Sequence, residues 1–225
     1  MNQDPPNAKA TRDTRNYYDN VDPLGIVDQS LLQFVARHCG PRILDLGCGP
    51  GGYSALLQRQ GFDVIAFDVN ENYIRTARDL GVAASIFDGQ SIPLPDKSVD
   101  SVMMIEVLEH IVDPSPLLRE VARVSRGGLV ASVPNCTRSF APAPVVYEHM
   151  LDVDHKTYFT IESLTALLHQ SFTHVEVRQI APVDTMLAQA ILPRSLMFVY
   201  ETARRLGLTG PRFYFRLLAT ARSAS

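Results

Sequence analysis

The sequence lacks several features that would assign a protein to a specialised class. It contains no tryptophan and only three cysteines, which are too few and too scattered for a disulfide framework or a zinc cluster. It has no uncharged apolar run of about 18 residues, so no membrane-spanning helix is expected. Its first residues lack an apolar run after a basic segment, so no secretory signal is expected and we predict a cytoplasmic protein.

An excess of positive charge is also missing. The chain has 21 Lys and Arg against 24 Asp and Glu, a net charge of −3, which gives no overall field to attract nucleic acid. With 225 residues, 46% of them hydrophobic, it can bury the core of one full α/β domain but hardly of two. We expect residues 1–12 to be disordered and residues 13–225 to form a single domain, as a monomer or homodimer.

The most informative stretch that is present runs from Ile43 to Gly52, with the sequence ILDLGCGPGG. It predicts a short buried strand, a tight turn rich in glycine, and the beginning of a helix. This is the usual nucleotide-binding start of an open α/β sheet. A purely structural turn is a weaker interpretation, because four glycines in six positions are costly to order.

Charge decides which nucleotide suits this turn. Gly47, Gly49 and Gly52 satisfy G-x-G-x-x-G, the pattern that offers bare amides to a diphosphate. Asp45, however, precedes the turn at the strand end, where its carboxylate repels phosphate and suits a ligand with an ammonium and a sulfonium. S-adenosylmethionine (SAM) has both groups and no phosphate. The run Asp45–Gly51 also resembles the first motif of class I SAM-dependent methyltransferases.

Further acids fall where such a cofactor would be held. Asp68 ends the expected second strand, 63–68, and could accept bonds from both ribose hydroxyls. Its alternative role, capping the next helix, suits Asn70 better. The resemblance implies that Asp88, after the third strand, contacts the adenine amino group, with Gln90 a less secure match. Ile105 and Glu106, at the end of the fourth strand, complete the expected cofactor-binding set.

A group of acids and histidines follows the fourth strand. The segments EVLEH (106–110), SVPN (132–135) and DHKTYFT (154–160) resemble a bacterial branch of class I methyltransferases. This branch includes ubiquinone-biosynthesis O-methyltransferases and enzymes that act on sugars or lipid-linked glycans. The resemblance covers roughly residues 40–180 and implies a small-molecule or lipid-linked acceptor.

A hydroxyl acceptor would need a general base. His110 and His155 are the catalytic candidates, because histidine titrates in the useful pH range. The tetrapeptide Asn/Asp-Pro-Pro-Tyr/Phe of amino-group methylases is absent after the fourth strand, which favours O-methylation. The alternative is that Glu106 and Glu109 fix the loop backbone while His110 caps or packs.

A narrower resemblance offers a different role for the same residues. Glu106, Glu109, His110 and the 154–156 segment are similar to the metal-binding pattern of small-RNA 3′-terminal 2′-O-methyltransferases. Two carboxylates and two imidazoles could hold a divalent cation that lowers the pKa of a hydroxyl. The absence of basic charge argues against RNA, and whether a metal binds stays open.

The order of periodic segments predicts a doubly wound, Rossmann-like α/β fold. We expect a mostly parallel sheet of seven strands with helices on both faces and an antiparallel last strand, Phe213–Ala219. The loop 136–154 and the segment 181–212 are expected on the substrate side. Tyr17 and Tyr18 are either packing residues or a flap over the cofactor.

The C-terminal part is rich in arginine. From residue 194 onward six arginines face one acid, Glu201, alongside two apolar runs at 187–192 and 196–200. This could be a basic amphipathic lid or a membrane-surface patch, which would leave peripheral membrane association open. The favoured alternative is helices that cover the sheet edge or form a dimer contact.

The sequence therefore predicts methyl transfer from SAM to a small or lipid-linked acceptor, with oxygen as the favoured acceptor atom. Two rivals from other classes are a nicotinamide-dependent dehydrogenase that uses Gly47, Gly49 and Gly52, and a SAM-binding domain without catalytic activity.

Overall fold

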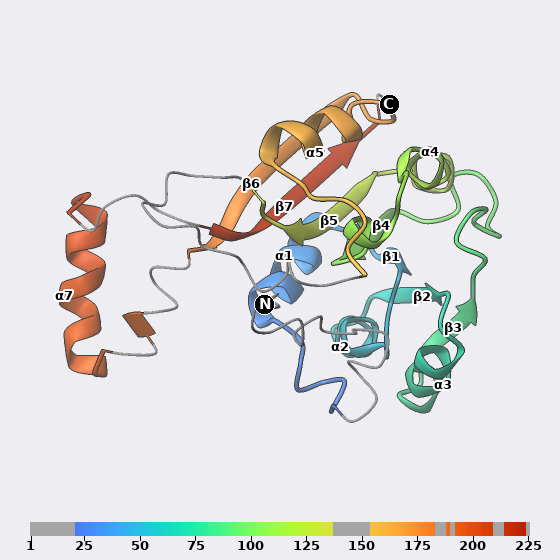
Figure 1. Ribbon diagram of the computed structural model, residues 1–225. Helices are drawn as coiled ribbons and strands as arrows, with labels where there is room; N and C mark the ends of the chain where they lie inside the picture. Colours follow the sequence, from blue (N-terminus) through green and yellow to red (C-terminus); the bar gives the residue numbers. More distant parts are fainter. Residues whose placement is uncertain (1–20, 137–153, 183–187, 190–191, 209–213, 224–225) are drawn as a thin grey trace, which may run out of the picture.

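A seven-stranded sheet is the centre of the structure, a computed structural model that describes residues 21–136, 154–182, 188–189, 192–208 and 214–223 (Figure 1). The strands follow the order β3-β2-β1-β4-β5-β7-β6. The first five are parallel, and β7 runs antiparallel to both of its neighbours, β5 and β6. The predicted fold class is confirmed, including the antiparallel last strand.

The element bounds lie close to the expected ones. The strands are β1 Arg42–Leu46, β2 Asp63–Asp68, β3 Ala83–Ile86, β4 Ser101–Ile105, β5 Leu129–Pro134, β6 His174–Pro182 and β7 Tyr214–Arg222. The helices are α1 Gln29–His38, α2 Gly52–Arg59, α3 Glu71–Asp79, the 3₁₀ turn η2 Leu108–His110, α4 Ser115–Val124, α5 Ile161–Leu168 and α7 Arg194–Arg205.

The central strands are apolar without a break because both faces of the sheet are covered. Adjacent residues of one strand point to opposite faces, so Ile43 packs with α1 and α2 while Leu44 packs with α4 and α5. Met103 and Met104 divide in the same way on β4. The α3 helix packs on the α1 side through Ile74 and Ala77.

Side-chain caps fix where three helices begin. Asp28 accepts hydrogen bonds from the amides of Ser30 (2.8 Å) and Leu31 (3.3 Å), so α1 begins at Gln29 rather than near Ile26 as expected. Asn70 caps α3 and Thr160 caps α5, as the sequence predicts. The Asn70 cap leaves the carboxylate of Asp68 available for another role.

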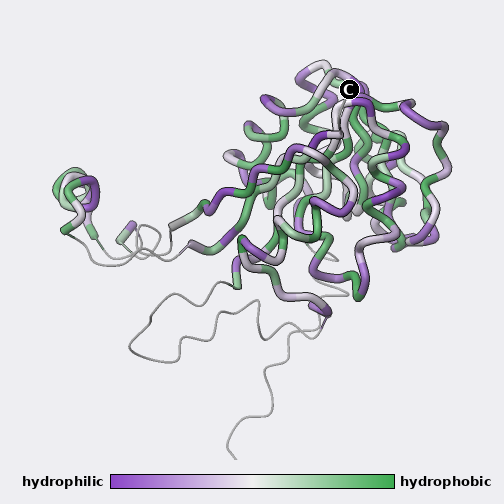
Figure 2. Tube along the Cα trace, turned by 90° about the horizontal axis from the view of Figure 1, so that it is seen from above, coloured by the Kyte–Doolittle hydropathy of each residue, from purple (hydrophilic) through white to green (hydrophobic). Residues whose placement is uncertain are grey.

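The segment between β6 and β7 departs from expectation. Its helix α7 has no buried residue, and both views place it away from the sheet (Figures 1 and 2). The favoured prediction that this helix covers the sheet edge is therefore wrong. Of the described helices, none has the length and apolar character needed to cross a membrane.

Several expectations concern residues outside the described ranges. These are the disordered N-terminus 1–12, the tyrosine flap at 17–18, and nearly all of the substrate loop 136–154. The division into one domain from residue 13 to 225 also stays a prediction.

Gly128 tests how tightly β7 is attached to the parallel part of the sheet. Its φ is +112°, and an added Cβ would lie 1.9 Å from the carbonyl oxygen of Ala221 on β7. We predict that Gly128→Ala lowers the free energy of unfolding by roughly 2–5 kcal/mol. Alanine is strained at this positive φ, and the backbone of β7 must also move away from the added Cβ. Urea unfolding measures this loss of stability.

Gly81→Ala is the matched control. Gly81 also has a positive φ, +83°, but an added Cβ there meets nothing within 4 Å. We expect Gly81→Ala to lower the free energy of unfolding by only about 1–2 kcal/mol, the cost of the left-handed conformation alone. Equal losses in the two variants would contradict the close approach of β7 to Gly128.

Candidate functional site

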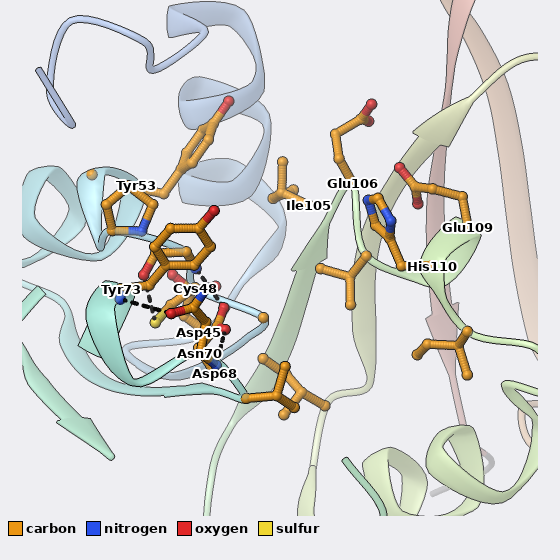
Figure 3. A pocket seen from close by; sticks show the side chains of 18 of the residues that line it. Asp45, Cys48, Tyr53, Asp68, Asn70, Tyr73, Ile105, Glu106, Glu109 and His110 are labelled. Carbon is orange, nitrogen blue, oxygen red and sulfur yellow. Dashed lines mark hydrogen bonds between the residues drawn. The ribbon is translucent and has the colours of Figure 1, made fainter. Parts of the chain in front are cut away.

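A cavity of about 860 Å³ opens at the carboxyl ends of the parallel strands. This is where open α/β sheets bind ligands. Figure 3 shows two groups of side chains that face each other across it. Asp45, Asp68 and Tyr73 lie on the side of β1 and β2, whereas Glu106 and His110 lie on the side of β4.

The amides of the glycine turn already have acceptors within the protein. Gly47 and Cys48 both donate to the carbonyl of Phe67, at 2.7 and 3.0 Å, and Gly51 donates to the carbonyl of Cys48 at 3.1 Å. A diphosphate site needs such amides to point at the ligand. This turn holds the neighbouring strand instead, which argues against a dinucleotide.

Asp68 occupies the fourth of these amides. Its Oδ2 accepts from Gly49 at 2.8 Å and its Oδ1 accepts from Asn70 at 2.8 Å. Burial raises the pKa of this carboxyl, while the bonds from Asn70 and Gly49 oppose the rise. Each carboxylate oxygen has a further lone pair, so Asp68 can still accept from two ribose hydroxyls, as predicted.

Asp45 is almost completely buried near the end of β1. It accepts a 2.6 Å hydrogen bond from the hydroxyl of Ser54 on α2 and lines the cavity. Burial raises its pKa from 3.8 to about 7, against the Ser54 hydrogen bond and with a contribution from the charge of Asp68. A cation bound beside it would stabilise its charged form.

Gly47 joins the two sides of the cavity. Its φ is +83°, and an added Cβ would lie 2.5 Å from a methyl group of Val107. Only glycine therefore allows the segment after β4 to approach the turn so closely. The cavity beside the turn is also lined by Ile105 and Glu106, which the sequence predicts to bind the cofactor.

Glu106 is held in an uncommon conformation by two partners. Its φ is +55°, its Oε1 accepts from the Ser132 hydroxyl at 2.7 Å, and the Nε of Arg216 lies 3.1 Å from the same oxygen. Arg216 also pairs with Asp28 at 3.1 Å, and the amide of Asp28 donates to the hydroxyl of Tyr53 at 3.2 Å. Glu106, at the carboxyl end of β4, is thus tied to the start of α1.

This network separates Arg216 from the other arginines of the C-terminal part. The sequence places Arg216 in the expected last strand, 213–219, and among six arginines that could form a basic lid or a membrane patch. Its side chain is not part of a surface patch, because it is mostly buried and lines the cavity. Two carboxylates neutralise it there. Strand β7, whose first residues lie beside the carboxyl end of β5, carries it into the site.

The two candidate histidines lie together. The rings of His110 and His155 are 4.8 Å apart, edge to face. The carbonyl of Glu109 accepts from the amides of Lys156 (2.7 Å) and Thr157 (3.0 Å), which brings the segment after residue 154 against η2. Both histidines line the cavity on the side opposite Asp68.

Three of the residues in the proposed metal set also meet. Potential ligand atoms of Glu109, His110 and His155 all lie within 4.8 Å of one another. Glu106 is not part of this group, since its carboxylate is engaged by Ser132 and Arg216. A carboxylate and two imidazoles suit a divalent transition metal better than magnesium.

Asp88 is the one predicted site residue that the structure does not bring to the cavity. It is fully exposed, and its carboxylate accepts from the amides of Gln90 (2.8 Å) and Ser91 (3.0 Å) in a turn. These bonds lower its pKa. Its neighbours Phe87 and Gly89 line the cavity instead, so the adenine contact of Asp88 stays a prediction.

The cavity lining is acidic. Among the described residues it contains six carboxylates and two basic side chains besides the histidines. The acids are Asp28, Asp45, Asp68, Glu106, Glu109 and Asp154, and the bases are Lys156 and Arg216. Such a site attracts a cationic ligand and repels an anionic one.

Sequence reasoning missed Asp28, Tyr53 and Arg216 as parts of the site. Tyr53 was assigned only to a helix side, and Asp28 lies in an unremarkable polar stretch. The pairing of Asp28 with Arg216 spans 188 positions of the chain. No local pattern indicates such a contact.

The comparisons with known proteins agree with this geometry. Residues 44–131 match the family model described as a methyltransferase domain. A "probable S-adenosylmethionine-dependent methyltransferase" of Mycobacterium tuberculosis is 32% identical over 145 residues, covering 62% of this chain and 52% of that protein. A ubiquinone biosynthesis O-methyltransferase of Xanthomonas oryzae is 33% identical over 141 residues, covering 57% and 59%. The chain thus spans about half the length of the curated relatives it matches.

A solved structure has the same fold. A crystal structure of a SAM-dependent methyltransferase from Archaeoglobus fulgidus superposes with a TM-score of 0.63 at 21% identity, covering 92% of this chain and 99% of that one. The matched domain, the similar sequences and the shared fold confirm the predicted resemblance to class I SAM-dependent methyltransferases. The cofactor of that family is SAM.

The raised pKa of Asp45 predicts a pH-dependent stability. Between the unfolded value of 3.8 and the folded value of about 7, the folded state holds a proton that the unfolded chain has released. Stability without ligand is therefore lost as pH rises through this window. Asn lacks the titration, so Asp45→Asn should become increasingly more stable than the unsubstituted protein as the pH rises from about 4 to about 7, and the difference should level off above that.

Urea unfolding of both proteins at several pH values measures this difference. Titrating groups that do not interact with Asp45 cancel because they are common to the two proteins, whereas Asp68 contributes through its interaction with Asp45. Parallel stability curves would show that Asp45 ionises in the folded state as easily as in water.

Proposed function

We propose that this protein transfers the methyl group of SAM to a hydroxyl oxygen of a small or lipid-linked acceptor. The observation that carries the proposal is the combination of an acidic cavity with a glycine turn in which the amides of Gly47, Cys48, Gly49 and Gly51 are already bonded. SAM is cationic at its sulfonium and ammonium and carries no phosphate, so it suits both features. Bound SAM supplies an electrophilic methyl group.

The residues on the β1 and β2 side would bind the cofactor. Asp68 would accept from the ribose hydroxyls, and Tyr73 and Phe87 line the cavity nearby. Asp45, at the cavity wall next to the turn, supplies negative charge for the cationic end. Ionisation of Asp45 is then favoured by the ligand, which offsets the cost of its burial.

The residues on the β4 side would act on the acceptor. Methyl transfer is an in-line displacement, so holding the hydroxyl in position supplies much of the acceleration. His110 and His155 lie where they could remove the hydroxyl proton. Arg216 keeps Glu106 in place, and the two histidines are the candidates for the general base on this side of the cavity.

Oxygen is favoured as the atom methylated for two reasons. One relative is named a ubiquinone biosynthesis O-methyltransferase, and the tetrapeptide of amino-group methylases is missing after β4. A cytoplasmic location and a monomeric or homodimeric state belong to the same proposal.

A metal-assisted form of the reaction is the second candidate. It is supported by the convergence of Glu109, His110 and His155. A divalent cation there would orient the hydroxyl and lower its pKa, with His110 and His155 as ligands instead of bases. RNA as the acceptor gains no support from the acidic cavity.

The dehydrogenase rival is disfavoured by the occupied turn amides. A SAM-binding domain without catalysis would share the Asp45 and Asp68 side of the cavity. Only a transfer assay separates it from an enzyme.

Calorimetry with SAM and NAD side by side tests the cofactor. We predict that SAM binds and NAD does not. Asp68→Asn should weaken SAM binding about tenfold or more, because a charged acceptor for two hydroxyls is lost. NAD binding with SAM excluded would overturn the proposal.

Asp88→Asn is the matched comparison, an identical change at an exposed acid outside the cavity. The structure predicts unchanged SAM affinity for it. A loss comparable to that of Asp68→Asn would instead support the adenine contact inferred from the resemblance.

The histidine roles are tested with an acceptor identified by transfer of a labelled methyl group. We predict that His110→Ala or His155→Ala lowers turnover by about 100-fold or more while SAM affinity changes little, since both lie opposite Asp68. His174→Ala, at an exposed position of β6, is the control. Unchanged turnover in both cavity variants would remove the histidines from the mechanism.

Metal analysis distinguishes base from ligand. A metal at about one equivalent in the unsubstituted protein, lost in Glu109→Gln, would favour the metal-assisted reaction. Full turnover after chelation would favour the general base.

A further inference from the structure

Helix α7 belongs to the segment that joins β6 to β7 at the same end of the sheet as the cavity. It lies between β6 and β7, and the first residues of β7 pair with the carboxyl end of β5, with Arg216 opposite Pro134. Pro182, at the end of β6, pairs with Tyr214, at the start of β7. The insertion thus leaves and rejoins the sheet on the substrate side, next to the strand that carries Arg216 into the cavity.

Apolar side chains on and just after α7 are open to water. Leu196, Val199 and Leu206 follow each other at helical spacing on one face. With Phe198 and Leu208 they are between 49% and 77% exposed. Figure 2 shows α7 apart from the body of the protein, with apolar and polar positions mixed along it. Five large apolar side chains gathered on one such segment indicate a binding surface.

The charge of α7 is opposite to that of the chain. The helix carries Arg194, Arg204 and Arg205 against Glu201, a net charge of +2, whereas the whole chain has −3. The remainder of the chain therefore carries −5. Arg194 and Arg205 are exposed. Exposed apolar side chains combined with local basic charge are typical of helices that lie in a membrane interface.

A second copy of the chain fits this surface less well. A two-fold contact through α7 would bring two equal sets of three arginines together, and like charges across an interface are costly. Anionic lipid headgroups complement the arginines, and the acyl boundary accepts the leucine and valine side chains of the face formed by Leu196, Val199 and Leu206.

We propose that α7 docks on an anionic lipid surface. The docking itself does not depend on methyl transfer. Its consequence does rest on the proposed function: because α7 and the cavity share one edge of the sheet, the acceptor would be a lipid or a lipid-linked molecule taken from that surface. This narrows the acceptor class.

Vesicle flotation tests the docking with the full chain. The probes are vesicles of phosphatidylcholine alone and vesicles with about 30 mol% phosphatidylglycerol, each at about 50 and about 300 mM salt. We predict flotation with the anionic vesicles only, weakened at the higher salt. Replacing Arg194 and Arg205 together by Gln should lower the partition constant about 25-fold, about fivefold for each charge.

Two matched controls separate α7 from general effects. Arg59→Gln with Arg119→Gln changes the net charge equally at exposed positions of α2 and α4, and should leave flotation unchanged. Leu196→Gln with Val199→Gln should abolish flotation, whereas Ile86→Gln, at an exposed apolar position of β3, should not.

Four results would overturn the proposal. They are no flotation with anionic vesicles, equal flotation with neutral ones, equal loss in the arginine controls, and a dimer in sedimentation that Leu196→Gln with Val199→Gln converts to monomer without any vesicle binding. SAM calorimetry on the same α7 variants keeps the two proposals apart. Normal SAM affinity with lost flotation concerns α7 alone, whereas absent SAM binding in the unsubstituted protein would refute the methyltransferase proposal and leave docking standing.

Discussion

The hydrogen bond from the Gly49 amide to the Asp68 carboxylate is the interaction on which the site depends. It connects the turn after β1 to the end of β2, beside the bonds that Gly47 and Cys48 donate to Phe67. These bonds consume the amides that other nucleotide-binding turns present to phosphate. The backbone of the glycine turn therefore organises the protein, and the carboxylate of Asp68 lines the cavity beside it. Asp45, buried behind the turn with Ser54 as its partner, extends this negative wall.

On the opposite wall the carboxylates have a different function. Glu106 is paired with Arg216, which is paired in turn with Asp28 at the beginning of α1. One arginine thus stabilises an acid in a left-handed conformation and fixes the helix that adjoins the cavity. Since the positive charge is cancelled locally, the net field in the cavity remains that of the other acids. Asp68 and the histidine pair lie on opposite sides of this acidic cavity (Figure 3).

Local sequence patterns predicted most of the fold and most of the residues that were expected at the cavity, but not Asp28, Tyr53 or Arg216. Continuous apolar runs predicted β1, β4 and β5, because strands covered on both faces carry no polar alternation. Asp68 and Asn70 could be told apart because a cap and a strand-end acid occupy different positions. Arg216 could not be predicted: its partners lie 110 and 188 positions away, and its neighbours made it look like part of a basic surface. At Asp88, a position that the resemblance marks for the cofactor, the side chain accepts hydrogen bonds within its own turn, and its adenine contact stays a prediction. The position of α7 was also unpredictable, because an amphipathic pattern does not state what covers its apolar face.

The placement of Arg216 on β7 has a consequence for how the molecule is made. The ribosome delivers β7 last of the seven strands, yet this strand lies between β5 and β6 and brings the cation that Glu106 and Asp28 require. A nascent chain that ends after β5 already contains the glycine turn and Asp68. Glu106 and Asp28 are also present, but the arginine that pairs with them has not yet been synthesised. The ion pairs of Arg216 with Glu106 and Asp28 therefore form only after β7, the last of the seven strands in the sequence, has been synthesised.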